Sequence, residues 1–320
     1  MKTIRMVILV FSLISCKSNQ TSDNLSPIQI MENYNGNSSF NIRDKLLSAP
    51  DIIINSLNEM DNANNYFSYK LNDYKIHLFL EYYEYLPLKY KKIITEKVIG
   101  IYFIDNYSGG GMTLPVFVNN GDMYMVLFFN QEILKKNITE WINSRDNSSF
   151  LDDKHDITLN VECNGDYYAL IHTLFHEASH VYDYYNFETP FTEPFQKNKK
   201  TILPTAFTKD IWSEYDKPKQ IYDFSRREDI SFYGFGEKID KTYAIEIFQA
   251  LNNTPFSSLY ASKTWAEDFA EGFTWYYLKK YFEIEYITKV YKNENLVIVF
   301  NPNENELARK RYKIFEKIME

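Results

Sequence analysis

Apolar residues recur along this chain with two different spacings, which predict a mixture of helices and strands. Spacings of three or four residues are typical of amphipathic helices, and they predict helices at about residues 41–62, 74–98, 132–145, 167–185, 242–251 and 258–278. Short apolar runs bounded by turn residues predict strands at 100–105, 113–118, 123–129 and 156–163. These elements indicate an α+β fold with mostly helices and a small sheet.

Two of the predicted strands, 113–118 and 123–129, are separated by a turn at Asn119-Asn120-Gly121 and should form a hairpin. Pro115 has no N–H group to donate to a neighbouring strand, so the first strand is expected at a sheet edge. The free backbone groups of an edge strand can bind an extended peptide. Alternatively, Pro115 only protects the edge from aggregation. The glycine run before the hairpin, 108–112, lacks the Gly-Lys-Ser/Thr of a phosphate loop and is expected to be a mobile connection.

The first sixteen residues have the pattern of an export signal. Lys2 and Arg5 precede an apolar run, residues 6–14, that is too short to span a bilayer. Leu13-Ile14-Ser15-Cys16 resembles the bacterial lipobox, in which the chain is cut before the cysteine and the thiol is acylated. We therefore expect a lipoprotein signal peptide at 1–15, with an ordinary signal peptide and an incidental cysteine as the alternative.

Residues 16–40 are rich in Ser, Asn and other polar residues, which predicts a flexible tether between a lipid on Cys16 and a domain at 41–320. The expected location is the bacterial cell envelope, at the outer membrane or cell surface. Cys163 is the only other cysteine, so acylation of Cys16 excludes an intrachain disulfide.

The remaining chain is acidic and rich in aromatic residues. The full sequence has a net charge of −8, and 45% of its residues are hydrophobic, enough to fill a core. Loss of Lys2 and Arg5 with the signal would make the charge −10. Such a surface argues against nucleic acid and anionic lipid as partners. We expect a monomer that reaches the membrane through its lipid alone.

One motif in the predicted helix 167–185 carries chemistry, namely His176-Glu177-Ala178-Ser179-His180. Residues four apart lie on one face of a helix, so His176 and His180 can bind one zinc ion while Glu177 reaches a water on it. The alternative is a chance match. Three of the five histidines fall in this segment, which is otherwise apolar, and buried polar side chains there need a partner. His172 lies a turn too far along the helix to share the ion and is expected to be a core residue or a neighbour of the ligands.

A catalytic zinc usually has three protein ligands and one open position. An extended motif with Gly and His after His180 is absent, because those positions are Asp183 and Asn186. The predicted helix 258–278 offers Glu267 and Glu271, one turn apart. Alternatively, Glu267 closes a capping box with Thr264 and only satisfies a backbone N–H.

The segment from His176 to Tyr185, followed by Tyr260 and by Glu267-Asp268-Phe269-Ala270-Glu271, resembles the gluzincin-type zinc metallopeptidases, most closely the group of the anthrax lethal factor catalytic domain. The match covers two short blocks, and the stretch between them is longer here. The resemblance implies a zincin-like fold, with one Zn²⁺ per chain. It also implies a role for each motif residue: ligands His176, His180 and Glu267, base Glu177, oxyanion donor Tyr260, and Glu271 and Asp183 as carboxylates that orient the ligands.

The stretch from about 187 to 256 contains four prolines and many aromatic residues, which predicts a largely irregular insert. It could shape the substrate cleft or cover it. We expect a secreted, lipid-anchored zinc metallopeptidase acting on a peptide or protein. Two alternatives remain: a non-catalytic zinc-containing surface lipoprotein that binds a partner, and a zinc amidase acting on cell-wall peptides. Glu177 separates the first alternative from catalysis, since structural zinc needs no base.

Overall fold

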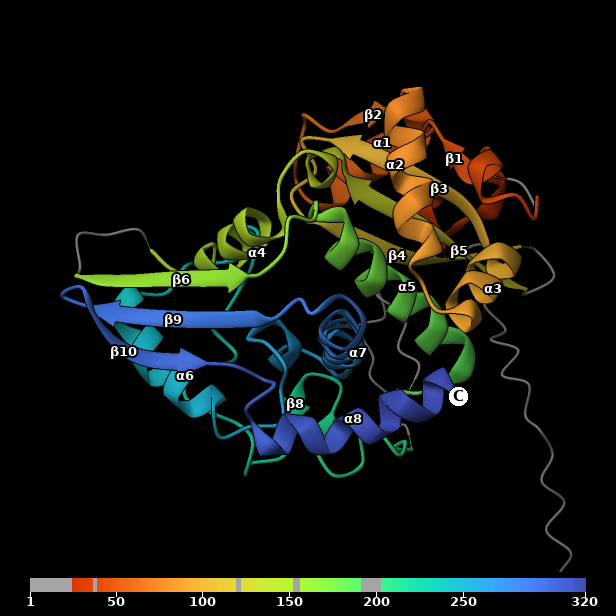
Figure 1. The fold of residues 1–320 in the computed structure, drawn as a ribbon. Helices are drawn as coiled ribbons and strands as arrows, with labels where there is room; N and C mark the ends of the chain where they lie inside the picture. Colours follow the sequence, from red (N-terminus) through yellow and green to blue (C-terminus); the bar gives the residue numbers. More distant parts are fainter. Residues whose placement is uncertain (1–24, 37–38, 119–121, 152–155, 191–202) are drawn as a thin grey trace, which may run out of the picture.

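The computed structural model describes residues 25–36, 39–118, 122–151, 156–190 and 203–320. The chain has an α+β architecture in which a five-stranded and a three-stranded sheet lie on different sides of two long helices, α5 (Leu170–Asn186) and α7 (Trp265–Phe282) (Figure 1). One large core of buried apolar side chains joins α5, α7 and a face of each sheet. The two helices that carry His176, His180 and Glu267 therefore pack in the middle of the fold.

The five-stranded sheet combines parallel and antiparallel strands. Its order is β1-β3-β5-β4, and β2 also pairs with β3. β3 runs parallel to β5, while β4 and β5 form the predicted antiparallel hairpin. The strands are β1 (Leu46–Leu47), β2 (Phe67–Tyr69), β3 (Val98–Asp105), β4 (Gly111–Phe117) and β5 (Met123–Asn130). β4 is an edge strand of this sheet, as Pro115 predicted, although an isolated bridge from Ile30 covers its end at Phe117.

Helices cover both faces of this sheet. α1 (Asp51–Met60) packs on one face in a second, smaller core, and α2 (Asp73–Glu84), α3 (Leu88–Lys97) and α5 pack on the other. Odd-numbered residues of β4 turn their side chains toward α5, as the contact of Thr113 with Glu177 shows. The edge strand β4 therefore lies directly beside residues 176–180 of α5.

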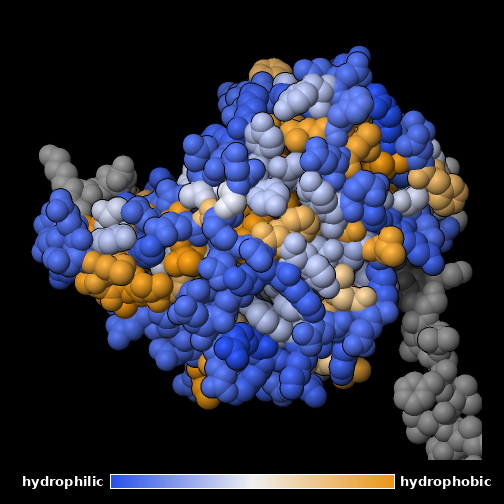
Figure 2. All heavy atoms as spheres, in the orientation of Figure 1, coloured by the Kyte–Doolittle hydropathy of each residue, from blue (hydrophilic) through white to orange (hydrophobic). Residues whose placement is uncertain are grey.

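The three-stranded sheet has the order β10-β9-β6, with both pairs antiparallel. It consists of β6 (Ile157–Cys163), β9 (Tyr286–Lys292) and β10 (Asn295–Phe300), with α4 (Ile138–Asn147) against β6 and α6 (Ala244–Leu251) against β10. Figure 2 shows a mostly hydrophilic surface with an apolar patch where β10 lies, and the exposed side chains there include Leu296, Val297 and Val299. α8 (Glu306–Met319) closes the chain against α7.

Several predicted helices are divided in the structure. Pro50 precedes α1, so the predicted helix 41–62 becomes the short helix η4 (Ile42–Lys45), strand β1 and α1. Pro87 separates α2 from α3 within the predicted helix 74–98, because proline disfavours the helical conformation of the residue before it. The remaining divisions give η5 (Gln131–Leu134) before α4, η6 (Lys241–Tyr243) before α6 and η7 (Tyr260–Ser262) before α7.

The N-terminal boundary also differs from the prediction. Residues expected to belong to the tether form η2 (Pro27–Gln29) and η3 (Met31–Asn33), and Ile28 and Tyr34 are buried against the five-stranded sheet. The folded part therefore includes residues before 41, because the apolar side chains of Ile28 and Tyr34 pack into the core beside this sheet.

Some predictions concern residues outside the described part: the signal peptide 1–15, Cys16 with the first part of the tether, and the turn Asn119–Gly121. β7 (Trp212–Glu214) and β8 (Lys217–Pro218) form a small hairpin in the insert. Within the described ranges, no helix has the length and apolar character needed to cross a membrane.

Candidate metal centre

The motif histidines lie on the buried face of α5. The helix is buried from Leu170 to Asp183, against α7, α3 and β4. His176 and His180 lie one turn apart, and their Nε2 atoms are 3.1 Å from each other. When two imidazole nitrogens lie at this short distance in a buried site, they need a proton or a cation between them.

Glu267 on α7 completes a group of three. Its Oε2 lies 3.0 Å from Nε2 of His176 and 3.5 Å from Nε2 of His180. Thr264 caps α7 by accepting a hydrogen bond from the backbone N–H of Glu267 at 3.1 Å. The capping position and the contact with the histidines are thus compatible, because the cap uses the backbone of Glu267 and leaves its carboxylate facing the histidines.

The spacing of these three atoms fits a tetrahedral ion. Ligand atoms at zinc distances, about 2.0–2.1 Å, are separated by about 3.3 Å in a tetrahedral site, and the three separations here are 3.0, 3.1 and 3.5 Å. Oε2 of Glu267 is buried, and the ion pairs that it forms are with the imidazoles of His176 and His180. His176, His180 and Glu267 could therefore hold one metal ion.

The electrostatics of the group favour a positive charge. Burial opposes the ionised form of Glu267, but the neighbouring His180 and His176 hold the pKa of its carboxyl well below the usual range. Burial likewise opposes the charged form of His176, but hydrogen bonds with Glu267 and Glu271 raise its pKa to about 10. A site that attracts a proton this strongly also attracts a metal cation, for which the proton competes.

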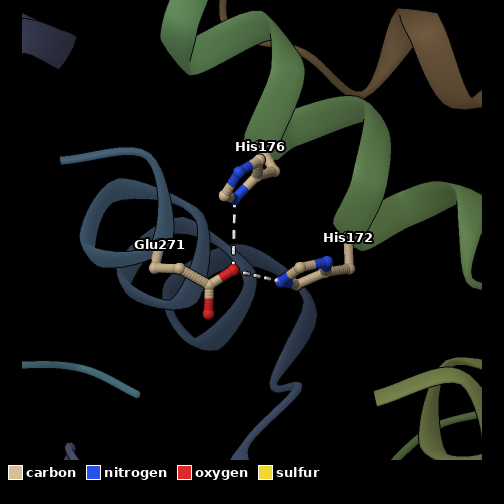
Figure 3. Close-up of side chains that lie close together, drawn as sticks. All are labelled: His172, His176 and Glu271. Atoms are coloured by element: carbon tan, nitrogen blue, oxygen red, sulfur yellow. Dashed lines mark hydrogen bonds and ion pairs between the residues drawn. The ribbon is translucent and has the colours of Figure 1, made fainter. Parts of the chain in front are cut away.

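Glu271 fixes His176 from behind. Figure 3 shows Oε1 of Glu271 facing both His176 and His172, with distances of 3.1 Å to Nδ1 of His176 and 3.0 Å to Nε2 of His172. Such a contact orients the imidazole and makes its other nitrogen a better ligand. Glu271 thus contacts His172 and His176 with the same carboxylate oxygen.

Three further side chains hold Glu271. Arg145 donates to Oε1 at 3.0 Å, while Ser258 and Trp275 donate to Oε2 at 2.6 and 3.0 Å. All of these groups are buried, so the carboxylate is fully engaged without a metal. Its environment is therefore fixed before any ion binds.

His172, His176 and Glu271 form a second group whose ligand atoms lie close enough for a metal ion. Arg145 lies at the same Glu271 oxygen, however, and its positive charge disfavours a cation there. Burial lowers the pKa of His172 to about 4, so this imidazole is neutral near pH 7. His172 is thus a partner of Glu271, set apart from the His176–His180 pair as the helix geometry predicted.

Glu177 lies between α5 and the edge strand. Thr113 on β4 donates a hydrogen bond to Oε2 of Glu177 at 2.8 Å. A Cβ atom at Gly111 would lie 2.7 Å from Oε1 and 2.8 Å from Cγ of Glu177, so a larger residue there would require the Glu177 side chain to move. Burial raises the pKa of the Glu177 carboxyl, which makes its carboxylate a stronger base.

Tyr260 lies close to His176, whereas Asp183 contacts the insert. The Tyr260 ring centroid lies 5.8 Å from that of His176, and its hydroxyl stays protonated because burial raises its pKa well above the usual value. Asp183 instead accepts hydrogen bonds from the backbone N–H and hydroxyl of Thr189, at 2.6 and 2.5 Å. Its visible role is to fix the end of α5 to the insert, and burial raises its pKa to about 6.

A cleft of about 560 Å³ opens onto these residues. One wall is the edge strand with Gly111 and Thr113, and the floor carries His176, Glu177 and His180. The opposite wall comes largely from the insert, through Tyr215, Ile230, Ser231, Phe232, Tyr233 and Phe235. The insert therefore helps to shape this cleft, which was one of the two roles that the sequence suggested for it.

The sequence reasoning did not identify Gly111, Thr113, Arg145, Ser258 or Trp275 as parts of the site. The glycine run was noticed as a loop, but nothing in it signalled contact with Glu177. No family model, no curated protein and no solved structure matches the chain. The likeness to gluzincins consequently rests on the motif residues, and the function rests on the geometry of the site.

Proposed function

We propose that the protein is a zinc-dependent peptidase. The observation that carries this proposal is the arrangement of His176, His180 and Glu267 around one point, with Glu177 beside it in an open cleft. Structural zinc sites usually have four protein ligands, whereas three ligands with an accessible fourth position are typical of catalysis. This count favours a hydrolase over a lipoprotein that keeps zinc only for its structure.

A bound zinc ion would supply a Lewis acid that polarises the scissile carbonyl and acidifies a water molecule. Glu177 takes a proton from the water and later passes it to the leaving amine. Its raised pKa suits both steps, because the group must accept the proton and then release it. Tyr260 donates a hydrogen bond to the negative oxygen that develops on the carbonyl.

The edge strand supports a peptide substrate. The carbonyl of Gly110 accepts from Asn130 and the N–H of Val118 donates to Asp122, so the even-numbered residues of this hairpin pair inward. Gly111 and Thr113 therefore turn their backbone N–H and C=O groups to the open side of the sheet. An extended peptide can pair with these groups as an added strand and bring its scissile bond beside Glu177.

The cleft also favours apolar substrate side chains. Its walls carry Met112, Tyr184, Tyr215, Phe232 and Phe235 close to the candidate ligands. We further propose that the enzyme is exported and anchored by a lipid on Cys16. A zinc amidase acting on cell-wall peptides would use the same groups, and the hydrolysis experiment below separates these two substrates.

The experiment combines metal content with turnover, using protein that begins at residue 17. Plasma mass spectrometry should find one zinc per chain, and the protein should cleave members of a mixed peptide library. Glu267→Ala should lose most of the zinc and the activity, whereas Glu177→Gln should keep the zinc and lose about 10²–10⁴-fold in kcat. Cleavage of purified cell-wall peptides in place of the library would favour the amidase.

Two matched variants serve as controls. Glu246→Ala removes an exposed glutamate from the first turn of another helix, α6, and His77→Ala removes an exposed helical histidine. Both should keep full zinc content and turnover. Full zinc content in Glu267→Ala would overturn the ligand set, and undiminished turnover in Glu177→Gln would remove the proposed base.

A further inference from the structure

A second cavity lies next to the cleft and belongs to none of the roles assigned so far. It has a volume of about 370 Å³ and is lined by residues of α4, of the segments that precede it, and of the insert. Three of its four charged side chains are basic, namely Lys136, Arg145 and Lys238, and the fourth is Glu132. On a protein with a net charge of −8, this is a local concentration of positive charge.

The acid in this lining is already paired, while the guanidinium group of Arg145 keeps one nitrogen without a partner in the described part of the chain. Glu132 pairs with Lys135 at 2.8 Å. Arg145 is 2% exposed, and its Nη2 is buried with no hydrogen-bond partner among the described residues. Arg145 pairs through Nε with Asp146 at 2.9 Å and through Nη1 with Glu271 at 3.0 Å, so Nη2 is the donor that remains for an anionic ligand in this cavity.

The cavity continues the line of the edge strand. Gly109 and Gly111 line the cleft, whereas Ser108 lines the second cavity. A Cβ atom at Gly110 would lie 3.4 Å from the ring of Trp141 and 3.4 Å from the hydroxyl of Tyr233, and both of these residues line the second cavity. The glycine run is thus a low ridge between the two hollows.

A peptide bound along β4 would cross this ridge. Residues 108–110 form a bend before β4, so the three residues from Gly111 back to Ser108 span at most the roughly 10 Å of an extended chain. A substrate that pairs with Gly111 and continues past it therefore reaches the cavity within about three residues. Tyr233 lines both hollows, so the insert shapes both.

We propose that this basic cavity, formed by Lys136, Arg145 and Lys238, is a specificity subsite that binds a carboxylate of the substrate peptide. The carboxylate belongs either to an acidic side chain or to the C-terminus of a peptide. That the ligand is a substrate peptide rests on the proposed peptidase function. The preference for a carboxylate rests only on the charges that line the cavity.

The test begins with the best-cleaved peptide of the mixed library. This peptide is resynthesised with Glu or Gln at each position on both sides of the cut, each with blocked ends, and the Gln series is repeated with a free C-terminal carboxylate. One carboxylate position about three residues from the cut should raise kcat/KM about tenfold. The double variant Lys136→Glu with Lys238→Glu should reduce this preference to less than twofold.

A second double variant controls for net charge. Lys89→Glu with Lys92→Glu changes two exposed lysines of α3, outside both hollows, and should keep the tenfold preference. If the Glu series shows the preference, the carboxylate is that of a side chain. If the Gln series with a free C-terminus shows it, the carboxylate is that of the C-terminus. Cleavage without any such preference, or a preference that survives the Lys136 and Lys238 reversal, would overturn the subsite and leave the peptidase standing.

A binding measurement separates the two proposals. Calorimetry with the Glu177→Gln variant compares blocked triglutamate with blocked triglutamine and with triglutamine carrying a free C-terminus. If no peptide is ever cleaved but a carboxylate peptide binds at least fivefold more tightly, and the lysine reversal removes this difference, the subsite stands and the peptidase proposal fails. Equal affinities for all three peptides would overturn the subsite.

Discussion

Gly111 and Glu177 meet so closely that a single methyl group should disturb catalysis. In Gly111→Ala the new Cβ would need the space of Oε1 and Cγ of Glu177, 2.7 and 2.8 Å away. The carboxylate must then move, and a displacement of about 1 Å can cost about 10²-fold in rate. We expect kcat to fall about 10- to 100-fold while zinc content stays at one per chain.

Gly109→Ala is the matched control for this change. A Cβ there meets nothing closer than 3.6 Å, which is an ordinary contact. Its kcat should stay within about twofold of the wild type, measured on the same peptide. Equal losses in both variants would show that the loop, and not the fit against Glu177, sets the rate.

His172 should make the stability of the protein sensitive to acid. Its pKa in the fold, about 4, lies below the value of about 6.5 in an unfolded chain, because burial disfavours the imidazolium. Between these values the unfolded state binds the extra proton, so stability rises with pH and is lost as pH falls. This single group should cost about 2 kcal/mol between pH 7 and pH 5.

Urea unfolding in the presence of a chelator tests this linkage. The difference in unfolding free energy between pH 7 and pH 5 should shrink by about 2 kcal/mol in His172→Phe. His77→Gln, at an exposed position of α2, should leave the difference as it is. An unchanged pH dependence in His172→Phe would mean that this imidazole binds protons equally in the folded and unfolded states, which would contradict the lowered pKa.

At the level of residues, sequence reasoning identified the groups with a recognisable spacing. His176 and His180 are four apart and Glu267 and Glu271 are four apart, so helix geometry alone places each pair on one face. Arg145, Thr113 and Ser258 approach these groups from other elements, far away in the chain. Nothing in their local sequence encodes that approach, which depends on how the helices and the sheet pack.

A buried ion pair joins α7 and α8, beside the contacts of Phe315 with Phe269 and Phe273. Arg311 on α8 donates to both oxygens of Asp268 on α7, at 2.6 and 2.7 Å, and both side chains are buried. Arg311→Met keeps the apolar stem but leaves a buried carboxylate without its cation. We expect a loss of about 3–5 kcal/mol in the free energy of unfolding, measured with urea.

The neighbouring pair of α8 offers a control. Lys310 and Glu306 are 3.0 Å apart on the exposed side of the helix, and Lys310→Met should change stability by less than about 0.5 kcal/mol. The double variant Asp268→Asn with Arg311→Met should recover part of the loss, since no buried charge remains. A cost below about 1 kcal/mol for Arg311→Met alone would contradict this account.

At the level of elements, the prediction was better for helix and strand type than for boundaries. The hairpin β4–β5 and strand β6 lie where apolar runs predicted them. The interruptions before α1 and α3 follow Pro50 and Pro87, whose effect on the helix pattern was underestimated. β9, β10 and α8 were not predicted. β9 has Ile287 and Tyr291 on its outer side, which hides the alternation that marks a strand.

The whole molecule is expected to reside at a membrane through one covalent lipid. In a bacterial host, the full-length protein should incorporate labelled palmitate and sediment with membranes. Cys16→Ser should lose the label and move to the soluble fraction, because no other acylation site precedes the folded part. Cys163→Ser is the control and should keep the label, since Cys163 is buried in the fold. Label retained by Cys16→Ser would exclude the lipobox.

The placement of the insert has a consequence for how such a protein can diversify. α5 carries the candidate ligands and also fills the core between the sheets, so a substitution there changes chemistry and folding together. The insert lines the cleft and the second cavity, and its described residues supply no candidate ligand. Changes in the insert can therefore alter the lining of both hollows without replacing a candidate ligand, whereas changes in α5 affect the candidate ligands and the core together.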